Sequence, residues 1–109
     1  MEKLSFCLLL IFTILSCDNE DEYPSCLTPI ISDLKEHHCD STANISKYRL
    51  KGDILFVIDP GRCWDHQAYD VLNSDCEVIG FLQGFTGNSM INGVDFYEQA
   101  KLISVIWPE

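Results

Sequence analysis

The stretch that decides the fold is ISKYRLKGDILFVI, residues 45–58. Its first six residues alternate in polarity, which is typical of a β-strand with one buried face. The turn Lys51-Gly52-Asp53 follows, and residues 54–58 are then all apolar, as in a buried strand. The stretch therefore predicts an antiparallel hairpin, which Asp59-Pro60-Gly61 ends with strong turn formers.

Further elements are predicted on both sides of this hairpin. Apolar residues at i, i+3, i+4 and i+7 predict a helix over residues 26–37, with Ser25 as its cap: Leu27, Ile30, Ile31 and Leu34. Strands are expected at 67–72, 76–82 and 102–107, a glycine- and asparagine-rich loop at 84–93 and a short helix at 94–100. We therefore expect an α+β fold, with an N-terminal helix packed on an antiparallel β-meander of four to five strands.

The first 24 residues have the features of an exported, lipid-anchored protein. Residues 1–16 carry Lys3 and then a short apolar run, which predicts a signal peptide. Ile14-Leu15-Ser16-Cys17 resembles the bacterial lipobox, so Cys17 is expected to become the acylated N-terminus. Residues 17–24 form an acidic tether, and residues 25–109 form a small domain stapled by disulfides.

The acidic run that follows Cys17 bears on localisation. Asp18-Asn19-Glu20-Asp21-Glu22 resembles the export tag of many Bacteroidota surface lipoproteins. The resemblance implies an outer-membrane lipoprotein that is exposed at the surface. A periplasm-facing lipoprotein with a plain solvated linker is the alternative.

Four cysteines remain after Cys7, in the leader, and Cys17: Cys26, Cys39, Cys63 and Cys76. An even number in a small exported domain predicts two disulfides. If the helix and the second strand run in the same direction, the two ends of the helix lie near the ends of the second and third strands. This geometry predicts the pairs Cys39–Cys63 and Cys26–Cys76. No C-x-x-C pair is present, so no zinc site and no other metal site is expected.

The charge of the chain limits its partners. The 109 residues carry a net charge of −10, and Glu2 and Lys3 cancel, so the exported part is equally acidic. Such a chain lacks the basic surface that nucleic acid requires. We expect contact with the membrane through the lipid on Cys17 and with an unknown protein or glycan, no nucleic acid, and no cofactor.

Two loops contain the candidate binding residues. The turn Arg62-Cys63-Trp64-Asp65-His66 has the densest set of chemically active side chains, and Arg62, Trp64, Asp65 and His66 are its candidates. The loop at 84–93 contributes Phe85 and Asn88. Its Gly84-x-x-Gly87 spacing lacks the lysine of a phosphate-binding loop, and the adjacent His37 and His38 point about 100° apart on a helix, a poor metal pair.

A series of short motifs resembles an uncharacterised family of small Bacteroidota lipoproteins. In order, the chain has Pro24-x-Cys26-Leu27, Lys47-Tyr48, Gly52, Cys63-x-Asp65, Gly84-Phe85-Thr86-Gly87, Asp95-Phe96 and Ile106-Trp107. Some members have further cysteines near positions held here by Ile79 and Val94. The resemblance supports the fold and the location, and it implies no activity.

The sequence therefore predicts a lipid-anchored interaction module of the cell envelope or cell surface with no catalytic residues. One alternative is a small hydrolase that uses Asp65 and His66 for acid–base chemistry. The other is a purely structural envelope lipoprotein without a discrete ligand.

Overall fold

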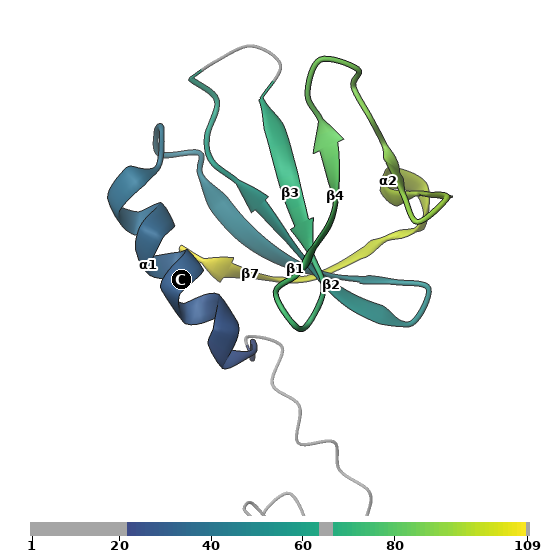
Figure 1. The fold of residues 1–109 in the computed structure, drawn as a ribbon, viewed down its shortest axis with the longest axis horizontal. Coiled ribbons are helices and arrows are strands. Elements are labelled where there is room, and N and C mark those ends of the chain that lie inside the picture. The colour runs from purple at the N-terminus through teal and green to yellow at the C-terminus, as the bar shows by residue number, and fades with distance from the viewer. Residues whose placement is uncertain (1–21, 64–66, 109) are drawn as a thin grey trace, which may run out of the picture.

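The computed structural model describes residues 22–63 and 67–108. Five strands form one sheet in the order β4-β3-β2-β1-β7, and neighbouring strands run antiparallel (Figure 1). Their bounds are β1 Asn44–Leu50, β2 Asp53–Asp59, β3 Ala68–Leu72, β4 Val78–Gln83 and β7 Lys101–Trp107. A second, two-stranded sheet pairs β5 (Met90–Ile91) with β6 (Val94–Asp95).

The predicted hairpin at residues 45–58 is confirmed as β1 and β2. The two strands pair without a break from Asn44 opposite Asp59 to Leu50 opposite Asp53. Lys51 and Gly52 link them with φ angles of +52° and +88°. Two consecutive residues with positive φ form the two-residue turn whose backbone twist matches the twist of the hairpin strands. Glycine adopts a positive φ without strain.

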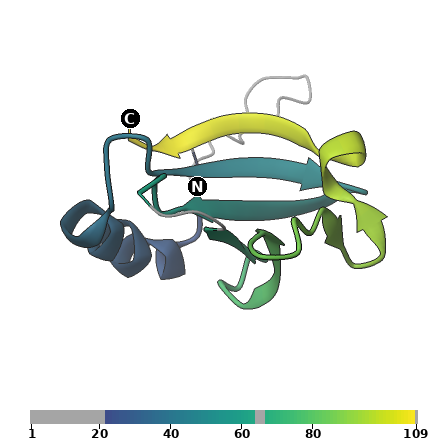
Figure 2. The ribbon, with the colours of Figure 1, turned by 90° about the horizontal axis from the view of Figure 1, so that it is seen from above.

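The last strand completes the sheet beside the first. β7 pairs with the free edge of β1, with Ser46 opposite Val105 and Arg49 opposite Lys101, so β7, β1 and β2 lie next to one another (Figure 2). Two register shifts interrupt this ladder. The strand predicted at 102–107 therefore exists, and its pairing with β1 joins residues that are 52 to 62 positions apart in the chain.

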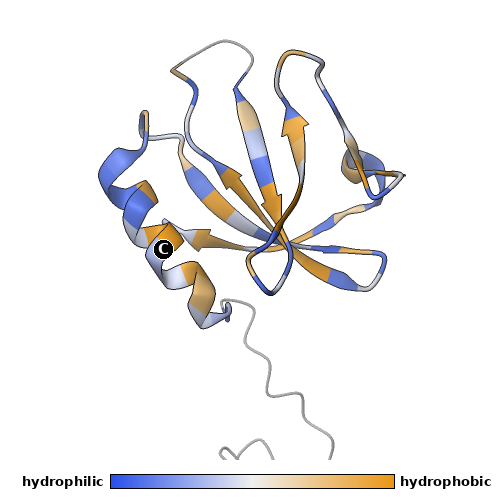
Figure 3. Ribbon diagram, in the orientation of Figure 1, coloured by the Kyte–Doolittle hydropathy of each residue, from blue (hydrophilic) through white to orange (hydrophobic). Residues whose placement is uncertain are grey.

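Helix α1 (Thr28–His37) covers part of one face of the sheet, and a 3-10 turn, η1 (Ser25–Leu27), precedes it. Residues 54–58 of β2 are all apolar, so hydrophobic side chains lie on both faces of the sheet (Figure 3). Between α1 and the sheet lies a first core, whose buried members include Leu27, Ile31, Leu34, Ile45, Phe56, Leu72 and Ile106.

The opposite face of the sheet has a core of its own. Its buried members are Leu50, Leu55, Val57, Val71, Leu82, Ile91 and Phe96, which come partly from β5 and from α2 (Phe96–Gln99). The loop expected at 84–93 thus contains a strand, and the helix expected at 94–100 is reduced to α2. Asp95 limits that helix, because its carboxylate accepts a hydrogen bond from the Glu98 amide and caps the first turn.

Two boundary predictions are wrong. Ser25 does not cap the helix: it lies inside η1, whose cap position is Pro24 without a side-chain hydrogen bond. The fourth strand begins at Val78, because Cys76 has a φ of +63°, which a strand residue does not adopt.

Two disulfides link these elements in the predicted pairs. Cys26 is joined to Cys76 and Cys39 to Cys63, with Cα–Cα distances of 6.1 and 5.8 Å. The structure thus has a short helix beside a largely antiparallel sheet of five strands. Because most of its regular structure is strand, the fold is mostly β, whereas we expected an α+β fold.

None of the helices in the part that the structure describes has the length and apolar character needed to span a membrane.

Candidate functional site

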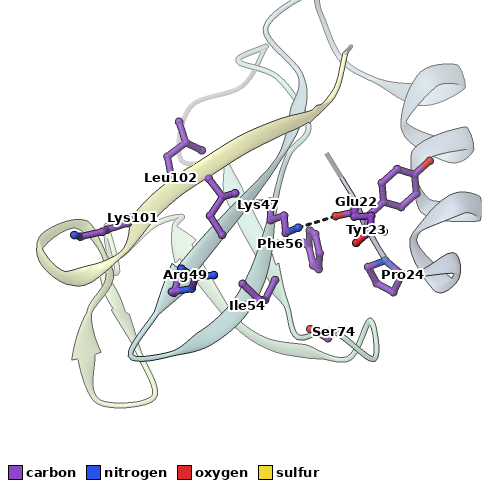
Figure 4. Close-up of a pocket in the computed structure, with 11 residues that line it drawn as sticks. Glu22, Tyr23, Pro24, Lys47, Arg49, Ile54, Phe56, Ser74, Lys101 and Leu102 are labelled. Atoms are coloured by element: carbon purple, nitrogen blue, oxygen red, sulfur yellow. Dashed lines mark hydrogen bonds between the residues drawn. The ribbon is translucent and has the colours of Figure 1, made fainter. Parts of the chain in front are cut away.

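A groove of about 730 Å³ lies on the helix-bearing side of the sheet, beyond the area that α1 covers (Figure 4). It is bordered by the segment that leads into η1, by β1 and β2, by the turn after β3 and by the start of β7. Its lining residues are Glu22, Tyr23, Pro24, Lys47, Arg49, Ile54, Phe56, Ser74, Lys101, Leu102 and Ile103. No residue of α1 is among them.

Strand periodicity explains why positive charge gathers there. Ile45, Lys47 and Arg49 alternate along β1 and therefore point to the same face. Ile45 is buried in the first core, whereas Lys47 and Arg49 come later in the strand and line the groove. Their partners on β2 are Phe56 and Ile54, which also line the groove, so cations lie beside an apolar surface.

Arg49 and Lys101 bring two positive charges together. They lie directly opposite each other in the β1–β7 ladder, where like charges destabilise a sheet. Among residues 22–63 and 67–108, neither the guanidinium nor the ammonium group has a hydrogen-bond or ion-pair partner. Lys47 differs, because its Nζ donates a hydrogen bond to the Glu22 carbonyl oxygen at 2.9 Å (Figure 4). The arrangement favours an anion that neutralises Arg49 and Lys101.

The same groove exposes apolar surface. Phe56 is 1% exposed and forms part of the floor, and Ile54 is half-buried. Tyr23 is 40% exposed, and Ile103 is half-buried. The groove therefore combines cations with accessible hydrocarbon.

Arg62, the first residue of the predicted binding turn, takes part in a network centred on Asp40. The Asp40 carboxylate accepts hydrogen bonds from the Thr42 hydroxyl at 2.6 Å, the Thr42 amide at 2.9 Å and the Arg62 amide at 3.3 Å. The Thr42 hydroxyl, followed by these amides, lowers the pKa of Asp40 below its ordinary value. Asp59 similarly accepts from the Gly61 amide, at 2.9 Å. Asp40 and Asp59 thus hold the described start of this turn.

The other candidates in this turn, Trp64, Asp65 and His66, lie outside the described residues, as does Cys17. The binding role of the turn and the hydrolase alternative therefore stay predictions.

In the second candidate loop, Phe85 and Asn88 differ sharply. Phe85 is 88% exposed in the turn that follows β4. Asn88 serves the fold, because its side-chain amide donates to the carbonyl oxygens of Phe81 at 2.6 Å and of Met90 at 2.9 Å. The Phe85 ring is thus largely exposed to solvent, whereas the Asn88 amide is occupied within the chain.

The described residues next to the two candidate loops share one end of the sheet. Ala68, where β3 begins, pairs with Gln83, where β4 ends, and the turn at 73–77 joins the two strands at the opposite end (Figure 1). The tether joins the domain at the other end, where Cys26 is bonded to Cys76. The groove lies on this tether side, since Glu22, Tyr23, Pro24 and Ser74 all line it.

Neither potential metal cluster offers a set of available ligands in the described part of the chain. His37 lies 3.1 Å from an Asp33 carboxylate oxygen, and His38 packs its ring against Trp107, with centroids 5.7 Å apart. Cys39, Asp40 and Cys63 lie within 4.8 Å of one another, but both sulfurs belong to a disulfide. Disulfide sulfur is not the thiolate that metals bind.

Sequence reasoning missed the residues that line the groove. The i, i+2 spacing of Lys47 and Arg49 in a predicted strand was a usable signal, because it places both cations on one face. Lys101 offered no local signal, because it joins them only through the pairing of β7 with β1.

Comparison with known proteins gives one match. A family model described as a domain of unknown function (DUF6970) matches residues 32–109, most of the chain and nearly all of the folded domain. No curated protein and no solved structure matches the chain.

Proposed function

The chain belongs to this family of unknown function, and from that premise we propose that it is a lipid-anchored binding module whose groove takes an anionic ligand. The observation that carries the proposal is the gathering of Lys47, Arg49 and Lys101 around one groove in a chain of net charge −10. Cations grouped in a concave, partly apolar site attract anions more strongly than cations scattered on a surface.

The cellular setting that we propose is the envelope of a Bacteroidota bacterium. The signal-like residues 1–16, the lipobox-like Ser16-Cys17 pair and the acidic run 18–22 support an outer-membrane lipoprotein exposed at the surface. The remaining four cysteines are all paired, as suits an oxidising compartment outside the cytoplasm.

Binding suits the groove better than catalysis does. Its lining residues include one carboxylate, from Glu22, and no histidine or cysteine. General acid–base or nucleophilic chemistry needs at least two such groups in hydrogen-bond reach of each other. The lysines and the arginine can neutralise and orient an anionic group without reacting with it.

The test is calorimetric titration of residues 18–109 with inorganic phosphate at low ionic strength. We expect binding that weakens as salt is added, because salt screens exposed charges. The double variant Arg49→Glu, Lys101→Glu should lose binding at least tenfold. Lys35→Glu is the matched control, since Lys35 is exposed on α1 and lies outside the groove.

Two results would contradict the proposal. One is an absence of phosphate binding by the intact domain. The other is an equal loss of affinity in Lys35→Glu, which would show that overall charge and not the groove is responsible.

A further inference from the structure

We infer that the ligand of the groove is an amphiphile, an anionic head group on an apolar chain, as in an acidic lipid. This inference rests on the function proposed above and specifies its ligand class. It follows from the way in which charged and apolar side chains share the groove.

The charged part of the site is the pair Arg49 and Lys101. Directly opposed residues in an antiparallel ladder have Cβ atoms about 4.5–5.5 Å apart, so one phosphate or carboxylate group is small enough to contact both side chains. Both side chains are exposed, and neither has a partner among the described residues. An anion between them replaces a repulsion with two attractions.

The apolar part of the site adjoins the charged part. Arg49 lies opposite Ile54 in the β1–β2 ladder, and Ile103, two residues after Lys101 on β7, also lines the groove. Phe56 continues the floor, and Tyr23 lies on the far side of the groove (Figure 4). Hydrocarbon therefore extends away from the cation pair, and a chain attached to the bound anion would cover it.

Tyr23 and Ile103 carry the argument for an apolar chain. Tyr23 is 40% exposed and Ile103 is half-buried, in a groove whose volume of about 730 Å³ suits a small molecule. A free inorganic anion would neutralise the cations and leave this surface in water. An acyl chain would bury it, and each buried methylene strengthens binding about fourfold.

The proposed experiment compares three probes on residues 18–109 by calorimetry, below their micelle concentrations. Dodecyl phosphate carries both features, inorganic phosphate only the charge, and dodecyl maltoside only the chain. We expect dodecyl phosphate to bind at least tenfold more tightly than either of the others. The double variant Arg49→Glu, Lys101→Glu should abolish that advantage over dodecyl maltoside.

Variants on β7 identify the surface that the chain covers. Ile103→Ala should weaken dodecyl phosphate binding about fivefold and leave inorganic phosphate binding unchanged. Val105→Ala is the matched control, because Val105 is 45% exposed on the same strand and lies outside the groove. Neither side chain belongs to the buried cores, and unchanged circular dichroism verifies that the variants are folded.

The outcomes separate this inference from the proposed function. Equal binding of phosphate and dodecyl phosphate would overturn the amphiphile and leave an anion site. Equal binding of dodecyl maltoside and dodecyl phosphate would overturn the role of charge, and with it both the amphiphile inference and the proposed anion-binding function. Equal effects of Ile103→Ala and Val105→Ala would place the chain elsewhere and overturn the inference alone.

Discussion

At the scale of single residues, Gly61 and Asp40 show how the turn after β2 depends on close packing. Gly61 has a φ of +116°, and a Cβ added there would lie 2.8 Å from the Asp40 Oδ1 atom. Gly61→Ala should therefore lower the free energy of unfolding by about 1–3 kcal/mol, measured by urea denaturation. Gly87→Ala is the control: its φ is +65°, no heavy atom lies within 4 Å of the added Cβ, and its effect should be smaller.

Asp70 predicts a pH dependence of stability. Burial on β3 raises the pKa of this carboxyl above its ordinary value of 3.8. The folded state thus favours the protonated form, and the stability present below pH 3.8 declines as the pH rises through the folded-state pKa. Asp70→Asn removes the charge, so the variant should melt at a higher temperature than the wild type at pH 7. The two should converge below pH 3.8, and an equal gap at both pH values would contradict this assignment.

Single side chains also mark how far sequence reasoning reached at the site. Arg62 was selected for its own side chain, yet the structure uses its backbone amide as a donor to Asp40. The i, i+2 spacing of Lys47 and Arg49 in a predicted strand places both on one face, but the groove's group of three cations also requires Lys101, which only the pairing of β7 with β1 brings there. The sequence lists the reactive side chains. Which of them line one groove depends on which strands pair in the sheet.

At the scale of elements, the two disulfides should contribute unequally. The cysteines of Cys26–Cys76 are 50 residues apart and those of Cys39–Cys63 are 24 apart. A longer closed loop removes more entropy from the unfolded chain, so the contributions are about 4.1 and about 3.4 kcal/mol. The double variant Cys26→Ser, Cys76→Ser should therefore be the less stable by about 0.6 kcal/mol in urea denaturation. The reverse order would show that strain or residual structure outweighs loop length.

Elements defined by local patterns were predicted well, and those defined by distant pairing were not. The helical apolar spacing from Leu27 to Leu34 and the hairpin at 45–58 are properties of adjacent residues, and both are confirmed. The register shifts between β1 and β7 and the small β5–β6 sheet are absent from the local sequence pattern. The β5–β6 segment packs on the second face of the sheet, where Ile91 and Phe96 are buried.

At the scale of the whole molecule, the proposed lipid on Cys17 governs where the domain is found. Cys17→Ser should move the protein from the membrane fraction to the soluble fraction after cell lysis, as followed by immunoblotting. The double variant Cys39→Ser, Cys63→Ser is the control, because it removes cysteines but keeps the lipobox-like sequence, and it should remain with membranes. Retention of Cys17→Ser in the membrane fraction would contradict anchoring through this residue.

The position of the Cys26–Cys76 disulfide has a mechanical consequence. Cys26 lies in η1, at the start of the folded domain, and Cys76 lies in the turn between β3 and β4. A pulling force on the N-terminal segment therefore reaches a covalent cross-link before it reaches α1. Because that cross-link transmits the load directly to the sheet, α1 is shielded from being peeled away by tension on the tether.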